Sequence, residues 1–129
     1  DINGYGDTVI YGPASNDGNT EVYDALERVC QAGGHDCIEF DQFPNSDDRS
    51  FQAAGIPNIS MAVLESNEAS QMHALMHAGP GNPPPDGPPP PIFTIIHTPN
   101  DTADHLDAAG MTLAYEVALG LVRELDRSQ

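Results

Sequence analysis

The sequence predicts an α/β protein whose sheet is mostly parallel or mixed and is flanked by helices. Short runs of β-branched and aromatic residues recur along the chain, as strands require. Helical patterns of apolar residues separate these runs, and alternation of strands with helices is typical of parallel sheets. A length of 129 residues corresponds to about one domain, so residues 1–129 are expected to form a single segment.

The first part of the chain predicts two strands around one helix. The β-branched and aromatic run at residues 8–11 indicates a short strand. A helix is expected to start at Asn19 or Thr20, either of which can cap it, and to run to about Ala32. Apolar and polar residues then alternate over residues 37–40, which predicts a second strand.

The middle of the chain predicts weaker elements. Residues 51–55 are expected to form one helical turn, and the apolar run 59–64 is expected to be a buried strand. Helical propensity is moderate over residues 67–77. His73 and His77 are spaced for one helix face and form the one pair there that could bind a metal, although no Glu lies between them as in His-Glu-x-x-His.

A proline-rich insert occupies residues 79–91 and cannot form a helix or a central strand. We interpret it as a surface loop, with a lid or a docking site for a proline-binding partner as the alternative.

The last part of the chain is organised around His97. The apolar run 93–97 predicts a buried strand that ends on this histidine, where open α/β sheets place their chemistry. Neutral imidazole is the commonest protein ligand for zinc, and a satisfied rim histidine is the alternative. A long amphipathic helix is expected from about Asp107 to Leu125. Its predicted buried stripe consists of Met111, Ala114, Val117, Ala118, Leu121, Val122 and Leu125.

Composition limits the partners of the chain. Four Arg residues and no Lys, against 20 Asp and Glu residues, give a net charge of −16. This charge argues against nucleic acid and anionic membrane surfaces as partners. No apolar run is long enough to span a membrane. The start at Asp1 predicts a mature, cleaved or excised segment, with a secreted or periplasmic location favoured. Cys30 and Cys37 form either a disulfide, which implies an oxidising compartment, or two buried thiols.

Three separated pieces resemble the zinc-dependent exopeptidases of the M28 aminopeptidase family. Residues 46–51 (Ser-Asp-Asp-Arg-Ser-Phe) with residues 55–57 (Gly-Ile-Pro) are similar to its Ser-Asp-His-x-x-Phe…Gly-Ile-Pro segment. Residues 97–102 (His-Thr-Pro-Asn-Asp-Thr) resemble its last metal-ligand segment, and residues 1–4 (Asp-Ile-Asn-Gly) resemble the segment whose Asp binds metal. The order and rough spacing of these pieces agree with the family.

The resemblance implies a partial three-layer, zinc-exopeptidase-like sandwich and an aminopeptidase-type hydrolase with two zinc ions. Its substrate would be a peptide with a free N-terminus. Asp1 would bind one zinc ion and His97 the other. The earlier His-x-Asp, the bridging Asp and the Glu-Glu pair of the family are not in this chain. The chain is therefore expected to be the C-terminal half of such a domain, inactive without an N-terminal half that carries the general-base Glu.

Four further residues are expected near the metal site or the substrate pocket. Asp48 replaces a family His, and Phe43 stands where some members carry a Tyr. Asp47 is interpreted as a loop-ordering carboxylate. Asp101, like Asp104, is interpreted as a cap of the last helix, with a contact to His97 as the alternative.

Two other functions remain open at this point. One is glutaminyl-cyclase-like acyl transfer with a single zinc ion. The other is a non-catalytic interaction module with a peptidase-like fold.

Overall fold

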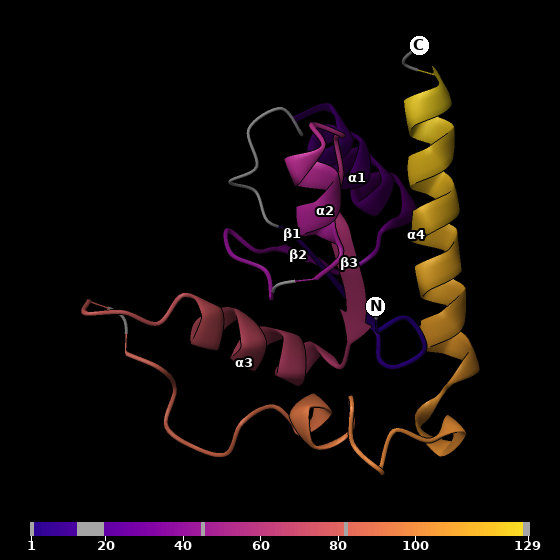
Figure 1. The fold of residues 1–129 in the computed structure, drawn as a ribbon. Helices are drawn as coiled ribbons and strands as arrows, with labels where there is room; N and C mark the ends of the chain where they lie inside the picture. Colours follow the sequence, from indigo (N-terminus) through magenta and orange to yellow (C-terminus); the bar gives the residue numbers. More distant parts are fainter. Residues whose placement is uncertain (1, 13–19, 45, 82, 128–129) are drawn as a thin grey trace.

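The computed structural model describes residues 2–12, 20–44, 46–81 and 83–127, and it shows a mixed three-stranded sheet with helices on both faces (Figure 1). Strand β1 (Thr8–Gly12) is central. Strand β2 (Cys37–Glu39) pairs with it in parallel, and strand β3 (Ser60–Leu64) pairs with it antiparallel. The predicted α/β class and the helix-flanked sheet are therefore confirmed, and of the two alternatives for the sheet the mixed one is correct.

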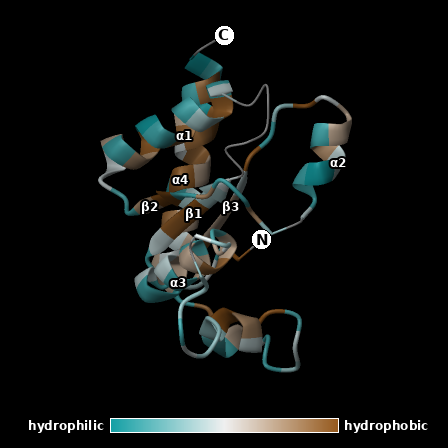
Figure 2. Cartoon of the chain, turned by 90° about the vertical axis from the view of Figure 1, so that its left-hand side faces the viewer, coloured by the Kyte–Doolittle hydropathy of each residue, from teal (hydrophilic) through white to brown (hydrophobic). Residues whose placement is uncertain are grey.

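Four α-helices and two short 3₁₀ helices complete the described part of the chain. Helices α1 (Thr20–Gly33) and α4 (Ala108–Arg127) pack against each other on one side of the sheet. Helix α3 (Ser66–Met76) contacts β1 on the other side. The short helix α2 (Asp48–Ala53) stands apart from α1 and α4 in Figure 2. The 3₁₀ helices η1 and η2 span Pro91–Thr94 and Ala103–His105.

The alternation of side chains along the strands creates two cores. Val9 and Val63 are paired across β1 and β3 and face Leu26 of α1. Their neighbours Ile10 and Leu64 face the opposite side, where α3 lies. Successive side chains of a strand point to opposite faces, so both faces of the sheet are apolar and both are covered.

The predicted strand at residues 93–97 is wrong. Helix η1 and a series of turns occupy this region instead, so the described sheet has three strands rather than about four. Pro90 caps η1 and Pro91 is its first residue, and a proline lacks an N–H for the sheet and has a fixed φ angle. The Thr94 hydroxyl donates to the Pro91 carbonyl at 2.7 Å and closes the turn locally.

The predicted buried stripe of the last helix is only partly correct. Ala114 and Val117 are buried, but Met111 and Val122 are 46% and 64% exposed, and Ala118 is also exposed. The buried face instead lies along Gly110, Leu113, Ala114, Val117 and Leu121. Because α4 packs on α1 and the sheet from one side only, its second apolar face is left uncovered by the described residues.

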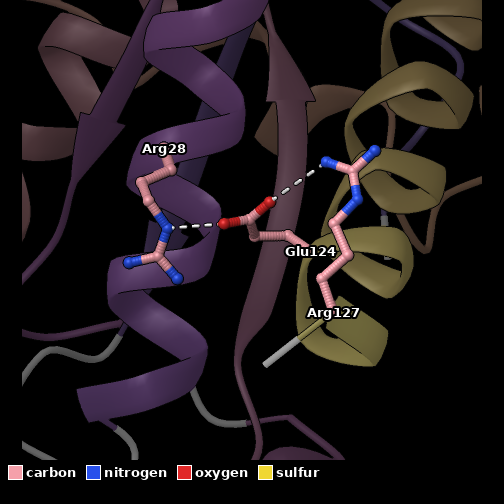
Figure 3. Close-up of polar contacts among 3 residues, drawn as sticks. All are labelled: Arg28, Glu124 and Arg127. Atoms are coloured by element: carbon pink, nitrogen blue, oxygen red, sulfur yellow. Dashed lines mark hydrogen bonds and ion pairs between the residues drawn. The ribbon is translucent and has the colours of Figure 1, made fainter. Parts of the chain in front are cut away.

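Covalent and ionic links join neighbouring elements. Cys30 of α1 and Cys37 of β2 form a disulfide, which decides between the two alternatives for these cysteines. The Arg28 Nε donates to Glu124 Oε1 at 2.7 Å and so joins α1 to α4, as Figure 3 shows. The pair is exposed and contributes below about 1 kcal/mol. Within the described ranges, no helix combines the length and the apolar character that a membrane crossing requires.

Candidate functional site

A cavity of about 700 Å³ lies on the α3 side of the sheet. Ile10 of β1 and Leu64 of β3 line it from the sheet, and Met72 lines it from α3. The wall opposite α3 comes from the segment 92–97, which takes the place of the predicted strand. The cavity is therefore mainly apolar, with its polar side chains supplied by two loops.

The two loops carry four of the residues that the sequence marked. Phe43 and Asp47 line the cavity from the loop between β2 and α2, while His97 and Asp101 line it from the turns after η1. The fold thus brings together four residues from two distant segments. Their meeting depends on packing, because neither segment is part of the sheet.

His97 lies in a tight turn rather than at the end of a strand. Its φ angle is 59°, a left-handed conformation that is uncommon for a residue with a side chain. Its backbone N–H donates to Asp101 Oδ2 at 3.3 Å. Asp101 therefore holds the backbone of His97 in its turn, whereas the contact suggested from the sequence was one that orients the imidazole.

The helix cap was assigned to the wrong residue. Asp107, rather than Asp101 or Asp104, caps α4, because its Oδ1 accepts the N–H of Gly110 at 2.6 Å. Its Oδ2 also accepts the N–H of Gly6 at 3.2 Å. Hydrogen bonds from Gly110 and then Gly6 stabilise the ionised carboxyl and lower the pKa of Asp107.

The loop-ordering role that the sequence suggested for Asp47 is carried by the side chain of its neighbour Asp48. The Asp48 Oδ1 accepts the N–H of Ser46 at 3.1 Å, so Asp48 orders the loop. Asp47 precedes α2 without a side-chain cap bond to it. Asp48 does not line the 700 Å³ cavity, but it lines a second cavity of about 570 Å³ together with Ser46 and Asp47, which line both.

Asp1, the other predicted zinc ligand, lies outside the described residues. The next residue, Ile2, lines the cavity, and its carbonyl accepts the N–H of Val63 at 2.6 Å. Farther along, Asp107 donates its N–H to the Gly4 carbonyl at 2.9 Å. Figure 1 shows this first loop beside the start of α4. The start of the described chain is therefore anchored next to β3, at the same cavity as His97.

The burial of Glu68 was not expected from the sequence. Glu68 is 2% exposed, and its Oε1 accepts the hydroxyl of Tyr5 at 3.0 Å. Burial raises the pKa of Glu68, with a further contribution from Glu65, and the hydrogen bond from Tyr5 only partly offsets them. Burial and Glu68 together raise the pKa of Tyr5 to about 12. The available signal was the position of Glu68 beside the apolar Ala69 and Met72 on the inner face of α3.

The donors at the cavity match zinc in type but not in number. Imidazole nitrogen and carboxylate oxygen, as in His97, Asp47 and Asp101, are ligands that zinc takes in proteins. A zinc enzyme commonly uses about three protein ligands on each metal ion. In the part of the chain that the structure describes, however, no three His, Cys, Asp or Glu residues are grouped so as to hold a metal ion. A complete zinc site here requires additional ligands.

Comparisons with protein-family models, with curated proteins and with solved structures find no match for this chain.

Proposed function

We propose that this chain is part of a zinc-dependent metallo-exopeptidase domain of the aminopeptidase type and supplies only part of its metal site. One observation supports the proposal most directly: Phe43, Asp47, His97 and Asp101 line one cavity. The resemblance to the M28 family marked these residues from their local motifs alone. Residues that belong to one functional site must lie close together, and a shared cavity meets that requirement.

In this proposal Asp1 and His97 are the zinc ligands contributed by the chain. Bound zinc would polarise the scissile carbonyl and lower the pKa of a water molecule. The remaining ligands and the general-base Glu belong to a complementary half of the domain. The Cys30–Cys37 disulfide fits a protein that folds in an oxidising compartment, in agreement with a secreted or periplasmic location.

The cavity also suggests which substrates to test first. Ile10, Met72 and Ile92 give it an apolar interior next to the imidazole of His97. An apolar first side chain of a peptide would bury its surface there, and each buried methylene contributes about 0.8 kcal/mol. The proposal therefore favours peptides whose free N-terminal residue is apolar.

The test compares two proteins on leucine and glutamate anilides with zinc present. One is this chain alone, and the other is a longer chain with the His-x-Asp and Glu-Glu segments of the family placed ahead of Asp1. We expect turnover from the longer chain only, and faster release from the leucine substrate. His97→Gln in the longer chain should lower kcat/KM by at least about a hundredfold, whereas His105→Gln, a control on η2, should leave it unchanged. Turnover by the 129 residues alone, or equal activity of the His97→Gln variant, would contradict the proposal.

A non-catalytic peptidase-like module is the second candidate. Asp48 in place of a His and Phe43 in place of a Tyr favour it, because the first change replaces an imidazole by a carboxylate and the second removes a hydroxyl group. Metal content separates the two candidates. About two zinc ions per longer chain support the enzyme, and a longer chain that folds without retaining zinc supports the module.

A further inference from the structure

A second group of metal-ligand side chains lies outside the cavity. His73 and His77 are one helical turn apart on α3, and Asp41 follows β2. The two imidazole rings are stacked with centroids 4.0 Å apart and planes inclined by 26°. His77 Nε2 lies 3.2 Å from Asp41 Oδ2. None of the three residues lines the 700 Å³ cavity.

The hydrogen bonds of His77 determine where its protons must be. His77 Nδ1 lies 2.8 Å from the carbonyl oxygen of His73. A carbonyl can only accept, so Nδ1 carries the proton and donates. In a neutral imidazole the other nitrogen, Nε2, then has a lone pair. This lone pair would face the carboxylate of Asp41, which is also an acceptor.

Two acceptors 3.2 Å apart repel each other unless a positive charge lies between them. That charge is either a second proton on His77 or a metal cation. The arrangement agrees with what metal sites use, since a ligating imidazole commonly donates its other N–H to a backbone carbonyl. Two donors that bind one tetrahedral zinc ion at about 2.0 Å are themselves about 3.3 Å apart. The distance of 3.2 Å between His77 Nε2 and Asp41 Oδ2 matches this separation of two zinc donors.

His73 can supply a third donor. Burial lowers the pKa of His73, and the neighbouring His77 lowers it further, so the ring stays neutral and keeps a lone pair near neutral pH. Its ring makes an edge contact with Phe40 at 5.2 Å. As the residues stand, no group of three donors in the described ranges converges on one point. For His73 to act as a third donor, its side chain would have to rotate out of its stack with His77.

We propose that Asp41, His77 and His73 form a surface site for a divalent transition-metal ion of the zinc, nickel or copper class. Imidazole donors favour these ions over calcium and magnesium, which prefer oxygen ligands. The net charge of −16 adds a general attraction for cations. This site is separate from the proposed exopeptidase site and does not depend on it.

The experiment titrates the metal-stripped 129-residue chain with zinc chloride at pH 7.5 and follows the heat of binding. We expect His77→Gln to weaken zinc binding at this site by at least tenfold, with smaller losses for Asp41→Asn and His73→Gln. The Asp41 side chain is 75% exposed, so the Asp41→Asn variant should fold normally, which far-ultraviolet circular dichroism verifies. In nitrogen NMR spectra, zinc should shift the Nε2 resonance of His77 and leave its Nδ1 protonated.

A control variant and a comparison variant separate this site from the cavity. His105→Gln, which changes neither group of residues, should bind zinc as the unsubstituted chain does. His97→Gln removes a ligand of the proposed cavity site, so the zinc binding that depends on His77 should be the part that remains. The proposal is overturned if the chain binds no zinc, if the His77→Gln variant binds zinc as the unsubstituted chain does, or if excess zinc leaves the Nε2 resonance of His77 unshifted. Loss of zinc binding in His97→Gln alone would also overturn it, while supporting the cavity as the metal site.

Discussion

At the scale of single residues, Glu68 is a buried carboxyl side chain whose ionisation is opposed by its surroundings. Its Oε2 is buried and has no hydrogen-bond partner among the described residues, while Oε1 accepts the hydroxyl of Tyr5. Burial therefore favours the protonated form over the charged form. The hydrogen bond between the Tyr5 hydroxyl and Glu68 also joins the first loop of the chain to α3.

A pH-dependent effect on stability follows from the raised pKa of Glu68. Below its ordinary value of 4.5, the carboxyl is protonated in the folded and unfolded states alike. As the pH rises, the unfolded state loses the proton first, so the free energy of unfolding falls until the pH passes the raised folded pKa. The Glu68→Gln variant has no carboxyl group to ionise at this position, so its free energy of unfolding does not fall for this reason. We expect its free energy of unfolding in urea, relative to the unsubstituted chain, to increase by about 1 kcal/mol between pH 4 and pH 7.

The control for this prediction is Glu116→Gln, which neutralises an exposed carboxylate on α4. Its difference from the unsubstituted chain should stay nearly constant over the same pH range. A Glu68→Gln difference that is equally flat would show that the buried carboxyl ionises at its ordinary pKa.

At the scale of elements, the contact between α1 and α4 depends on a glycine. A Cβ placed on Gly120 would lie 2.7 Å from Cγ1 of Val29, closer than real Cβ contacts allow. Valine in a helix has one strongly preferred rotamer, so it cannot easily turn away. The glycine thus permits a close approach of the two helices at the expense of helix propensity.

The substitution Gly120→Ala tests this contact. Alanine improves helix propensity by about 1 kcal/mol, but the clash with Val29 should outweigh that gain and lower the free energy of unfolding. In a Val29→Ala background the clash is absent, so Gly120→Ala should instead stabilise the chain by about 1 kcal/mol. Urea denaturation of the four proteins gives the coupling energy. The same effect of Gly120→Ala in both backgrounds would show that the helices do not approach closely at this point.

At the scale of the whole molecule, charge repulsion is the main long-range force. Twenty acidic residues and four Lys and Arg residues leave a net charge of −16 on a chain of 13.7 kDa. Such an excess destabilises a compact state through self-repulsion. The few surface ion pairs, such as Arg28 with Glu124, offset little of it.

Salt should therefore stabilise this protein. Raising sodium chloride from about 10 mM to about 150 mM shortens the screening length from about 30 Å to about 8 Å, which weakens repulsion across the molecule. We expect the melting temperature to rise by about 4 °C, equivalent to about 1 kcal/mol for a domain of this size. Potassium chloride at equal ionic strength should give the same rise, because screening does not depend on the identity of the ion. An unchanged or lower melting temperature would show that repulsion is not a significant term.

The elements that could be predicted from the sequence are those that nearby residues determine. Strand β1 and helix α1 lie within about two residues of their expected positions, because β-branched runs, capping residues and glycine stops act over a few residues. The segment 93–97 was not predictable in this way. Its apolar, β-branched composition suits a strand, but it packs as η1 and turns over the cavity instead.

The candidate site likewise has a part that short motifs predicted and a part that depends on how distant segments pack. Local motifs were enough to mark His97, Asp101, Phe43 and Asp47, and the fold places all four at one cavity. The cap at Asp107 depends on where α4 begins relative to the first loop. The geometry of Asp41 with His77 depends on α3 crossing near the end of β2.

The sequence by itself determined the α/β class, the acidic surface and the residue types available for metal binding, because composition and periodicity are local properties. Only the tertiary structure decided that the sheet is mixed rather than mostly parallel, that the described residues leave one face of α4 uncovered, and that Cys30 and Cys37 are joined. It alone also decided that Glu68 is buried and that the Nε2 of His77 faces Asp41. Each of these depends on which distant segments meet, and that is set by the burial of apolar surface over the whole chain.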